Sequence, residues 1–178
     1  EMAQRILKAR EEADSVGGVT ETVICGTPAG VGEPWFDSVE SIISHAAFSL
    51  GGVKGIEFGA GFAAADMKGS ECNDPLRVSG GRIVTTTNNN GGVNGGITNG
   101  MPIVFRCAVK PTPSIAQTQD TVDFIKNENT QLSIHGRHDP AIIRRICPVL
   151  DSVAALCVAD MLSLRYGTDV LTKGVDDK

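Results

Sequence analysis

Residues 102–111, PIVFRCAVKP, alternate apolar and polar side chains, and this alternation decides how the rest of the fold is interpreted. A period of two residues is typical of a strand that buries one face. The apolar positions fall on one side of such a strand: Ile103, Phe105, Cys107 and Val109. Arg106 and Lys110 share the opposite side. We therefore predict a half-buried strand with two cations on its outer face.

Two more strands and a long connection are predicted from the neighbouring sequence. Residues 19–26 and 53–59 are short runs bounded by glycine and rich in the side chains that favour strands. Residues 59–81 are rich in glycine and alanine, which predicts a long irregular loop with helical character at residues 63–67. Residues 120–128 are compatible with either a strand or a short helix.

Two helices are predicted in the first part of the chain. Residues 1–18 place apolar side chains at helical spacing and end in a pair of glycines. We expect this helix to enter the fold with no leader ahead of it. Asp37 and Glu40 form a D-x-x-E capping pattern, which predicts a second helix that runs to about Leu50.

A long helix is predicted to begin at Asp139 and Pro140. Aspartate suits the N-cap of a helix, and proline suits its first helical position. Pro148 lies inside the apolar stripe that follows, and we predict a kink there. The polar tail, residues 167–178, is expected to be frayed.

These elements predict one compact unit over residues 1–178 that belongs to the α+β class. The helices do not alternate regularly with the strands, which disfavours a βαβ dinucleotide fold. The chain has 178 residues, and 41% of them are hydrophobic, which is enough for one core. A single domain, or part of a larger one, follows.

The composition disfavours several classes of partner. A net charge of −5 with only 4% aromatic residues gives nucleic acid no basic face or stacking platform. The five cysteines are odd in number and form no CxxC pair, so we expect no disulfide framework and no metal site, and we place the protein in the cytoplasm. With neither a signal peptide nor a long apolar run, we expect no membrane insertion.

Three segments carry residues suited to chemistry. In residues 88–100, NNNGGVNGGITNG, glycine lets a backbone approach a ligand and asparagine offers donors and acceptors. A tightly turning or mobile loop explains the same composition. In residues 110–115, KPTPSI, Lys110 and Ser114 suit a phosphate clamp, and a solvated lysine before a proline turn is the alternative.

The third segment is HGRHDP, residues 135–140. Histidine titrates near neutrality and arginine binds phosphate or carboxylate through two hydrogen bonds, so the segment suits proton transfer and anion binding. Asp139 also has a purely structural explanation as an N-cap, to which a catalytic role can be added. The sequence contains no Walker A, GxSxG or HExxH motif.

Taken in order and at these separations, the segments resemble the carboxy-terminal half of chorismate synthases. Residues 86–115, TTNNNGGVNGGITNGMPIVFRCAVKPTPSI, and residues 136–145, GRHDPAIIRR, carry the resemblance. Residues 14–18, DSVGG, and residues 32–74, GEPWFDSVESIISHAAFSLGGVKGIEFGAGFAAADMKGSECND, share it. It runs from about residue 9 to residue 164, which is nearly the whole chain.

The resemblance implies a fold and a reaction. The fold is a fragment of a β-α-β sandwich, in which helices flank antiparallel sheet. The reaction converts 5-enolpyruvylshikimate 3-phosphate into chorismate by a 1,4-anti elimination of phosphate and a C6 proton, within the shikimate pathway of aromatic amino-acid biosynthesis. Reduced FMN is the cofactor and is not consumed overall. The family is typically a homotetramer, so we expect a homo-oligomer.

The resemblance also assigns residues to a site. It implies a cofactor site made of Asn89, Asn90, Lys110, Ser114 and Arg137. Family members usually have alanine where this chain has Asn90. Arg137 and Asp139 are the implied catalytic residues, because Arg137 faces substrate and cofactor while Asp139 assists proton movement at flavin N5. The role of Arg106 is left open.

Family members are longer, and their amino-terminal half bears a serine-histidine-glycine motif, a second catalytic histidine and several arginines that hold the anionic substrate. This sequence has none of these motifs. We therefore expect an incomplete chorismate synthase that is inactive alone. The alternative hypothesis is a non-catalytic folded fragment or oligomerisation module that binds no flavin.

Overall fold

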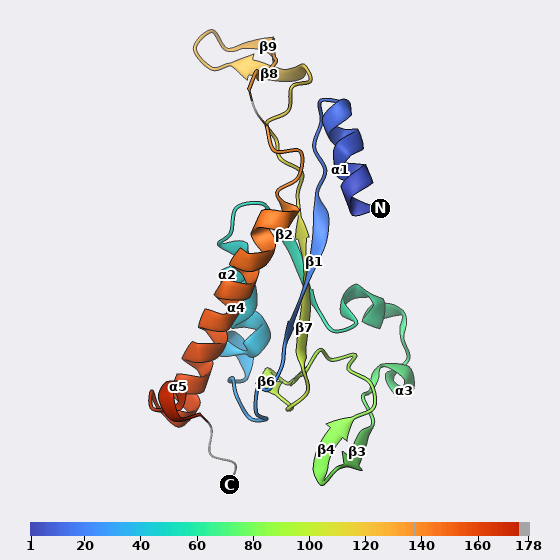
Figure 1. Cartoon of the computed structure of the whole chain (residues 1–178), viewed down its shortest axis with the longest axis vertical. Helices are drawn as coiled ribbons and strands as arrows, with labels where there is room; N and C mark the ends of the chain where they lie inside the picture. Colours follow the sequence, from blue (N-terminus) through green and yellow to red (C-terminus); the bar gives the residue numbers. More distant parts are fainter. Residues whose placement is uncertain (137, 175–178) are drawn as a thin grey trace.

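The centre of the molecule is a three-stranded antiparallel sheet in the order β1-β7-β2 (Figure 1). The computed structural model describes residues 1–136 and 138–174. The sheet consists of β1 (Gly18–Ile24), β7 (Ile103–Val109) and β2 (Val53–Phe58). The alternation predicted for the central strand is confirmed, because β7 buries every second side chain from Ile103 to Val109. Both edge strands pair with it along most of their length.

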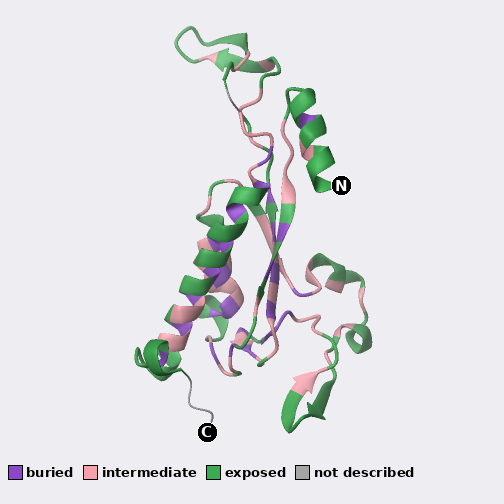
Figure 2. Cartoon of the chain, in the orientation of Figure 1, coloured by how far each residue is buried: buried purple, intermediate pink, exposed green. Residues whose placement is uncertain are grey.

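Two helices cover one face of this sheet (Figure 1). α2 (Val39–Phe48) packs against β2, and α4 (Ile143–Tyr166) packs against β1 and α2. In Figure 2 the buried residues gather in the sheet and along the inner sides of these helices. The largest fully buried side chains include Phe105, Ile43, Ile103 and Leu150. The predicted α+β class with antiparallel sheet and flanking helices is therefore confirmed.

Short elements extend the molecule at both ends of the sheet. The hairpin of β8 (Gln119–Asp123) and β9 (Glu128–Leu132) projects at one end, near α1 (Met2–Glu11) (Figure 1). The segment predicted as strand or helix is thus mainly strand. The hairpin of β3 (Leu76–Ser79) and β4 (Arg82–Thr85) projects at the other end. Both hairpins are largely exposed (Figure 2).

The remaining short elements lie in the long connections. The segment 59–81 holds the helical turn η2 (Gly61–Asp66), close to the predicted position, and also α3 (Gly69–Cys72) and β3. Another turn, η1 (Trp35–Asp37), precedes α2. β5 (Val93–Asn94) and β6 (Ile97–Thr98) form a minimal hairpin within the asparagine and glycine segment. The predicted loops therefore contain more regular secondary structure than their composition indicated.

The N-terminus of α4 differs from the prediction. The helix begins at Ile143, and Asp139 is not its N-cap. The carbonyl of Pro140 accepts a hydrogen bond of 2.8 Å from the backbone N–H of Val16, so it is committed to another segment and does not enter the helix. Pro148 lies within α4, which continues through it to Tyr166, and the kink stays a prediction.

The other chain ends and caps show smaller differences. Ser38, not Asp37, caps α2, because its hydroxyl accepts a hydrogen bond of 3.1 Å from the N–H of Ser41. In the tail that we expected to be frayed, α5 (Val170–Lys173) forms and Val170 is buried. Residues 175–178 lie outside the described part of the chain.

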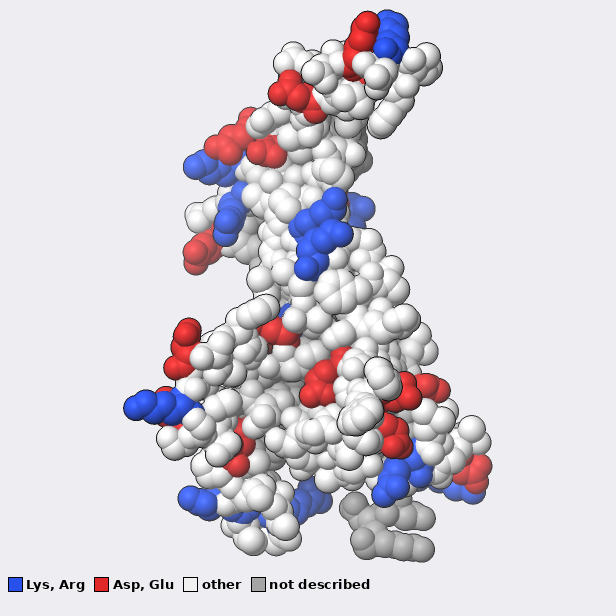
Figure 3. All heavy atoms as spheres, turned by 180° about the vertical axis from the view of Figure 1, so that it is seen from behind, with Lys and Arg blue, Asp and Glu red and all other residues white. Residues whose placement is uncertain are grey.

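Among the described residues, α4 alone is long and apolar enough to cross a membrane by length and composition, with a mean hydropathy of 1.7 in its most apolar window. Its inner face packs on the sheet and α2, as the core helix of a domain does. On the face of the molecule shown in Figure 3, acidic and basic side chains are scattered over a mostly uncharged surface.

Candidate functional site

The predicted site residues lie in two groups at opposite ends of β7. Asn89 and Asn90 precede the start of the strand, where the carbonyl of Gly91 accepts a hydrogen bond of 3.1 Å from the N–H of Val104. Lys110 follows its last residue, and Ser114 lies further along the chain. From Val104 to Lys110 the strand advances six residues, which separates the two positions by about 20 Å. The described chain does not bring all the predicted residues into one pocket.

The first group is organised by Asp74, a residue for which the sequence predicted no role. The carboxylate of Asp74 accepts hydrogen bonds of 2.7 Å from both the N–H of Asn89 and the hydroxyl of Thr87. Its second oxygen accepts from the N–H and the side-chain amide of Asn90, at 2.9 and 2.8 Å. Partial burial alone would raise the pKa of Asp74, but these hydrogen bonds lower it below its ordinary value.

The asparagine amides in this group are turned toward the protein. The side-chain N–H2 of Asn89 donates to the carbonyls of Glu71 and Cys72, at 3.2 and 3.1 Å. Asn88 donates to the carbonyl of Pro102 at 2.8 Å and accepts from the N–H of Gly92 at 2.8 Å. The amide nitrogens of Asn89 and Asn90 are thus engaged within the chain, and flavin contact by these residues stays a prediction.

Two glycines allow a close crossing of chain segments beside this group. Gly59 and Gly91 both have positive φ, +55° and +63°, and lie against each other. A Cβ on Gly59 would overlap the carbonyl of Asn89, which accepts a hydrogen bond of 2.7 Å from the N–H of Ala60. Here the glycine-rich composition serves contact between backbones.

Arg106 links the same crossing to the outer face of the sheet. Its guanidinium donates to the carbonyl of Gly59 at 2.6 Å. It also lies 3.1 Å from a carboxylate oxygen of Glu57 and 3.4 Å from one of Glu21, so one cation stands between an acid on each neighbouring strand. The arginine whose role the sequence left open therefore joins all three strands to the turn at Gly59.

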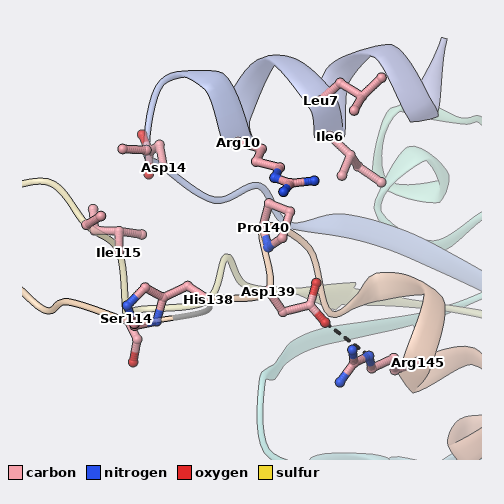
Figure 4. A pocket seen from close by; sticks show the side chains of 13 residues that line it. Ile6, Leu7, Arg10, Asp14, Ser114, Ile115, His138, Asp139, Pro140 and Arg145 are labelled. Atoms are coloured by element: carbon pink, nitrogen blue, oxygen red, sulfur yellow. Dashed lines mark ion pairs between the residues drawn. The ribbon is translucent and has the colours of Figure 1, made fainter.

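Part of the second group, to which Asp139 also belongs, lines a pocket of about 650 Å³ (Figure 4). Ser114 and Asp139 both line it, whereas Lys110 does not. One wall comes from α1, through Ile6, Leu7 and Arg10. The end of α1 is tied to the opposite wall, because Ser15 donates to the carbonyl of Thr112 at 2.6 Å and Ala116 donates to the carbonyl of Ala13 at 3.2 Å.

Asp139 is held at the rim of this pocket by two partners. One carboxylate oxygen lies 3.0 Å from Nε of Arg145, and the other accepts a hydrogen bond of 3.3 Å from the N–H of Ala141 (Figure 4). The side chain of Asp139 keeps 29% of its surface exposed, so solvent and ligand both reach it. The carboxylate is fixed in direction yet accessible, as a proton-transfer group requires.

His138 adds a second titratable group to the pocket. Its Nε2 lies 3.0 Å from the carbonyl of Ile134. A carbonyl only accepts hydrogen bonds, so Nε2 is the donor in this contact. Arg137, predicted as both catalytic and cofactor-binding, lies outside the described residues.

Sequence reasoning missed Arg10, Asp74 and Arg145 as members of these groups. Only Arg10 had a readable signal, because Ile6 and Arg10 are four positions apart and share one face of a helix. Asp74 and Arg145 gain their partners from the tertiary structure. Among residues 1–136 and 138–174, no three His, Cys, Asp or Glu side chains gather as metal ligands.

Comparison with known proteins agrees with this architecture. The family model described as chorismate synthase matches residues 1–163. The chain is 50% identical over 166 residues to the chorismate synthase of Methanosarcina acetivorans and 49% identical over 166 residues to that of Korarchaeum cryptofilum. These alignments cover 93% and 92% of the chain, and 45% and 46% of the relatives. The chain therefore spans a little less than half the length of these relatives.

A solved structure supports the same relationship. A structure titled "Crystal Structure of Chorismate Synthase" superimposes with a TM-score of 0.76 at 31% identity, over 94% of this chain and 43% of that one. The fold predicted from the resemblance is therefore confirmed as a fragment of that structure's fold.

Proposed function

We propose, from the premise that the chain belongs to the chorismate synthase family, that it supplies the flavin-side part of an active site. The enzyme to which that site belongs is a phosphate lyase that converts 5-enolpyruvylshikimate 3-phosphate into chorismate in aromatic amino-acid biosynthesis. Its cofactor is FMN, which supports the elimination in reduced form without being consumed. The observation that carries the proposal is that Ser114 and Asp139, which come from separate segments, line one pocket.

The pocket fits a flavin in size and in chemistry. Its volume of about 650 Å³ lies within the range of roughly 300 to 1,000 Å³ that is typical of cofactor sites. Apolar side chains such as Leu7 and Ile115 suit a planar ring system, and Arg10 and Ser114 suit a phosphate. Lys110 is not part of this lining and precedes Ser114 by four residues at the end of β7.

In this proposal each residue of the second group has one task. Ser114 donates a hydrogen bond to the anionic end of the cofactor, and Lys110 and Arg10 stabilise its charge. Asp139 holds or moves a proton beside the ring, and Arg145 fixes the direction of its carboxylate. The apolar part of the lining excludes water from the ring.

An anaerobic titration of the chain with reduced FMN tests the proposal. We expect saturable binding, and we expect Ser114→Ala to weaken it, whereas Ser79→Ala in the exposed strand β3 should leave it unchanged. The titration is repeated with 5-enolpyruvylshikimate 3-phosphate, and the same samples are assayed for chorismate. Binding without product supports a flavin-side part of a larger site. A flat titration would favour the non-catalytic module instead.

The setting of the enzyme is part of the proposal. We place it in the cytoplasm and expect a homotetramer, as in the family. Exposed apolar side chains on α4, Leu156 and Leu164, with 70% and 76% of their surface accessible, support association with further chain or with other copies. A sedimentation profile that stays monomeric at high concentration would contradict this expectation for the chain.

A further inference from the structure

Two aromatic side chains are exposed to solvent at the turn before α2. Trp35 and Phe36 in η1 keep 82% and 84% of their surface accessible. Their rings pack edge to face, with 6.1 Å between the ring centroids. Exposed apolar side chains that lie together are typical of interaction surfaces, and tryptophan is enriched among the residues that dominate binding there.

The backbone of this turn is held in place. Trp35 has a φ of +68°, which is rare for a bulky residue and persists only where the surrounding structure enforces it. Its carbonyl accepts hydrogen bonds from the N–H of Ser38 at 3.3 Å and from the hydroxyl of Ser41 at 3.4 Å. The N–H of Val39 donates to the carbonyl of Gly96 at 3.0 Å, which ties the turn to the β5–β6 hairpin. The aromatic pair is therefore presented on a fixed backbone.

The charges beside the aromatic pair are all negative. Glu33 and Asp37 are exposed on either side of it, and residues 26–53 contain no lysine or arginine. Within residues 1–136 and 138–174, neither carboxylate forms an ion pair. We call residues 33–37 the aromatic surface. It fits an arginine-bearing partner, because arginine pairs with carboxylates and stacks on aromatic rings.

The β3–β4 hairpin offers two arginines of this kind. Its register pairs Arg77 with Val84 and Ser79 with Arg82, so both arginines lie on one face of the hairpin. Residues 75–86 contain no acidic side chain. In the described part of the chain neither arginine forms an ion pair, so both are available to carboxylates from outside.

The hairpin also projects from the body of the molecule (Figure 1). β3 is exposed along its whole length, and Val78 and Ile83 keep 78% and 73% of their surface accessible (Figure 2). A two-stranded hairpin is marginally stable in water unless it packs against something else. This geometry favours a contact with another molecule.

The hairpin and the aromatic surface lie at the same end of the sheet, where β7 begins. The aromatic surface is tied to Gly96 in the β5–β6 hairpin, and the N–H of Thr85 in β4 donates to Sδ of Met101 at 3.5 Å. A twofold axis near this end can set the hairpin of each copy against the aromatic surface of the other. Reciprocal contacts of this kind are the commonest in homo-oligomers.

We propose that the arginine face of the β3–β4 hairpin docks on the aromatic surface of a second copy of this chain. The guanidinium groups of Arg77 and Arg82 stack on the aromatic rings and pair with the carboxylates of Glu33 and Asp37. Two identical contacts form in each pair of copies. The contact requires no flavin, and it is separate from the exposed apolar side chains of α4.

Charge reversal in the full 178-residue chain tests the contact. Arg77→Glu/Arg82→Glu makes the hairpin acidic, and Glu33→Arg/Asp37→Arg makes the aromatic surface basic. Each variant alone sets like charges against each other in both contacts, whereas a mixture of the two variants has opposite charges in both. Trp35 is the only tryptophan of the sequence, so the concentration dependence of its emission reports burial of the aromatic surface. Sedimentation measures the mass, and thermal unfolding checks that each variant is folded.

We expect the wild-type emission to move to shorter wavelength as concentration rises, with a matching gain in mass. Each variant should raise the Kd of this transition by about 100-fold or more, because like charges meet. An equimolar mixture of the two variants should recover the transition. Arg5→Glu/Glu11→Arg, two exposed positions of α1 near the other end of the sheet, should keep the wild-type Kd (Figure 1).

Three results would overturn the proposal. The first is a wild-type emission that does not change with concentration. The second is a transition that persists in both variants, because the copies would then associate elsewhere. The third is its loss in both variants without rescue by mixing, because the two surfaces would then not meet each other.

Discussion

Asp139 and Arg145 form an ion pair across the start of α4, with 3.0 Å between a carboxylate oxygen and Nε. The pair connects a pocket residue to the first turn of the longest helix, so the helix sets the direction of the carboxylate. The guanidinium is largely exposed, with 81% of the side chain accessible, and exposed pairs contribute at most about 1 kcal/mol to stability. We therefore infer that the ion pair serves mainly to orient the carboxylate of Asp139.

The first prediction separates orientation from stability. Arg145→Gln should change the free energy of unfolding by less than about 1 kcal/mol, yet lower turnover by about tenfold in a full-length chorismate synthase that carries this half. Asp139→Asn should lower turnover further, by about 100-fold or more, because the proton-transfer group itself is lost. Thermal unfolding and chorismate formation measure the two effects.

Arg144→Gln is the matched control, because Arg144 is exposed on the same helical turn and does not line the pocket. It should behave as the wild type in both measurements. Near-normal turnover in Asp139→Asn would rule out its catalytic role, and equal loss in Arg144→Gln and Arg145→Gln would remove the argument from the ion pair.

The fold could be predicted where local pattern and packing agree. The alternation in β7 survives in the structure because its apolar side chains are buried on one face, in the same hydrophobic cluster as side chains of α2 and α4. The start of α4 could not be predicted, because it depends on the hydrogen bond between Val16 and Pro140, two residues far apart in sequence. Local propensity favoured Asp139 as a cap, and a tertiary contact overrode it.

The sequence predicted which segments contribute to the candidate site, but not how their side chains are arranged in space. Family resemblance selects Ser114 and Asp139, and the structure places both at one pocket. It also selects Asn89 and Asn90, whose amide nitrogens prove to be engaged within the chain. Asp74 carries no local signal, because an aspartate before a proline is equally at home in any turn.

The second prediction concerns the reactivity of the thiols. Burial raises the pKa of Cys107, and burial together with the charge of Asp160 raises the pKa of Cys157. Cys25 and Cys147 are exposed. With a disulfide reagent at mildly alkaline pH, Cys25 and Cys147 should react promptly, while Cys107 and Cys157 should wait for unfolding. Mass spectrometry of the modified peptides identifies the order.

The same reagent in concentrated urea is the control, because all five cysteines of the sequence should then react at similar rates. Prompt modification of Cys107 in the folded chain would mean that the sheet opens at β7. That result would also argue against the burial of β7 beneath α2 and α4 in one hydrophobic cluster.

The third prediction concerns the pH dependence that Asp74 gives to stability. Its pKa in the folded chain lies below the ordinary value of 3.8, so its ionised form stabilises the fold above that pH. This contribution is lost as the pH falls through the lowered pKa. The urea midpoint of the wild type should exceed that of Asp74→Asn at about pH 6, and the gap should narrow toward about pH 3. A gap of constant size would show that the ionised form has no special role.

The last prediction uses two glycines with the same backbone conformation and different surroundings. Gly59 and Gly95 have φ of +55° and +60°, a region that costs an alanine about 1 to 2 kcal/mol. A Cβ on Gly59 would overlap the carbonyl of Asn89, whereas a Cβ on Gly95 would meet no atom within 4 Å. The two substitutions therefore share the backbone cost and differ in the steric one.

Gly95→Ala should lower the free energy of unfolding by about 1 to 2 kcal/mol, and Gly59→Ala by about 2 to 4 kcal/mol. Only Gly59→Ala should also speed hydrogen exchange at residues 89 and 90, because it forces apart the segments that cross there. Urea unfolding and exchange together measure this difference. Equal losses in the two variants would mean that the crossing of Gly59 and Asn89 is looser than the structure shows, and that glycine serves only the turn.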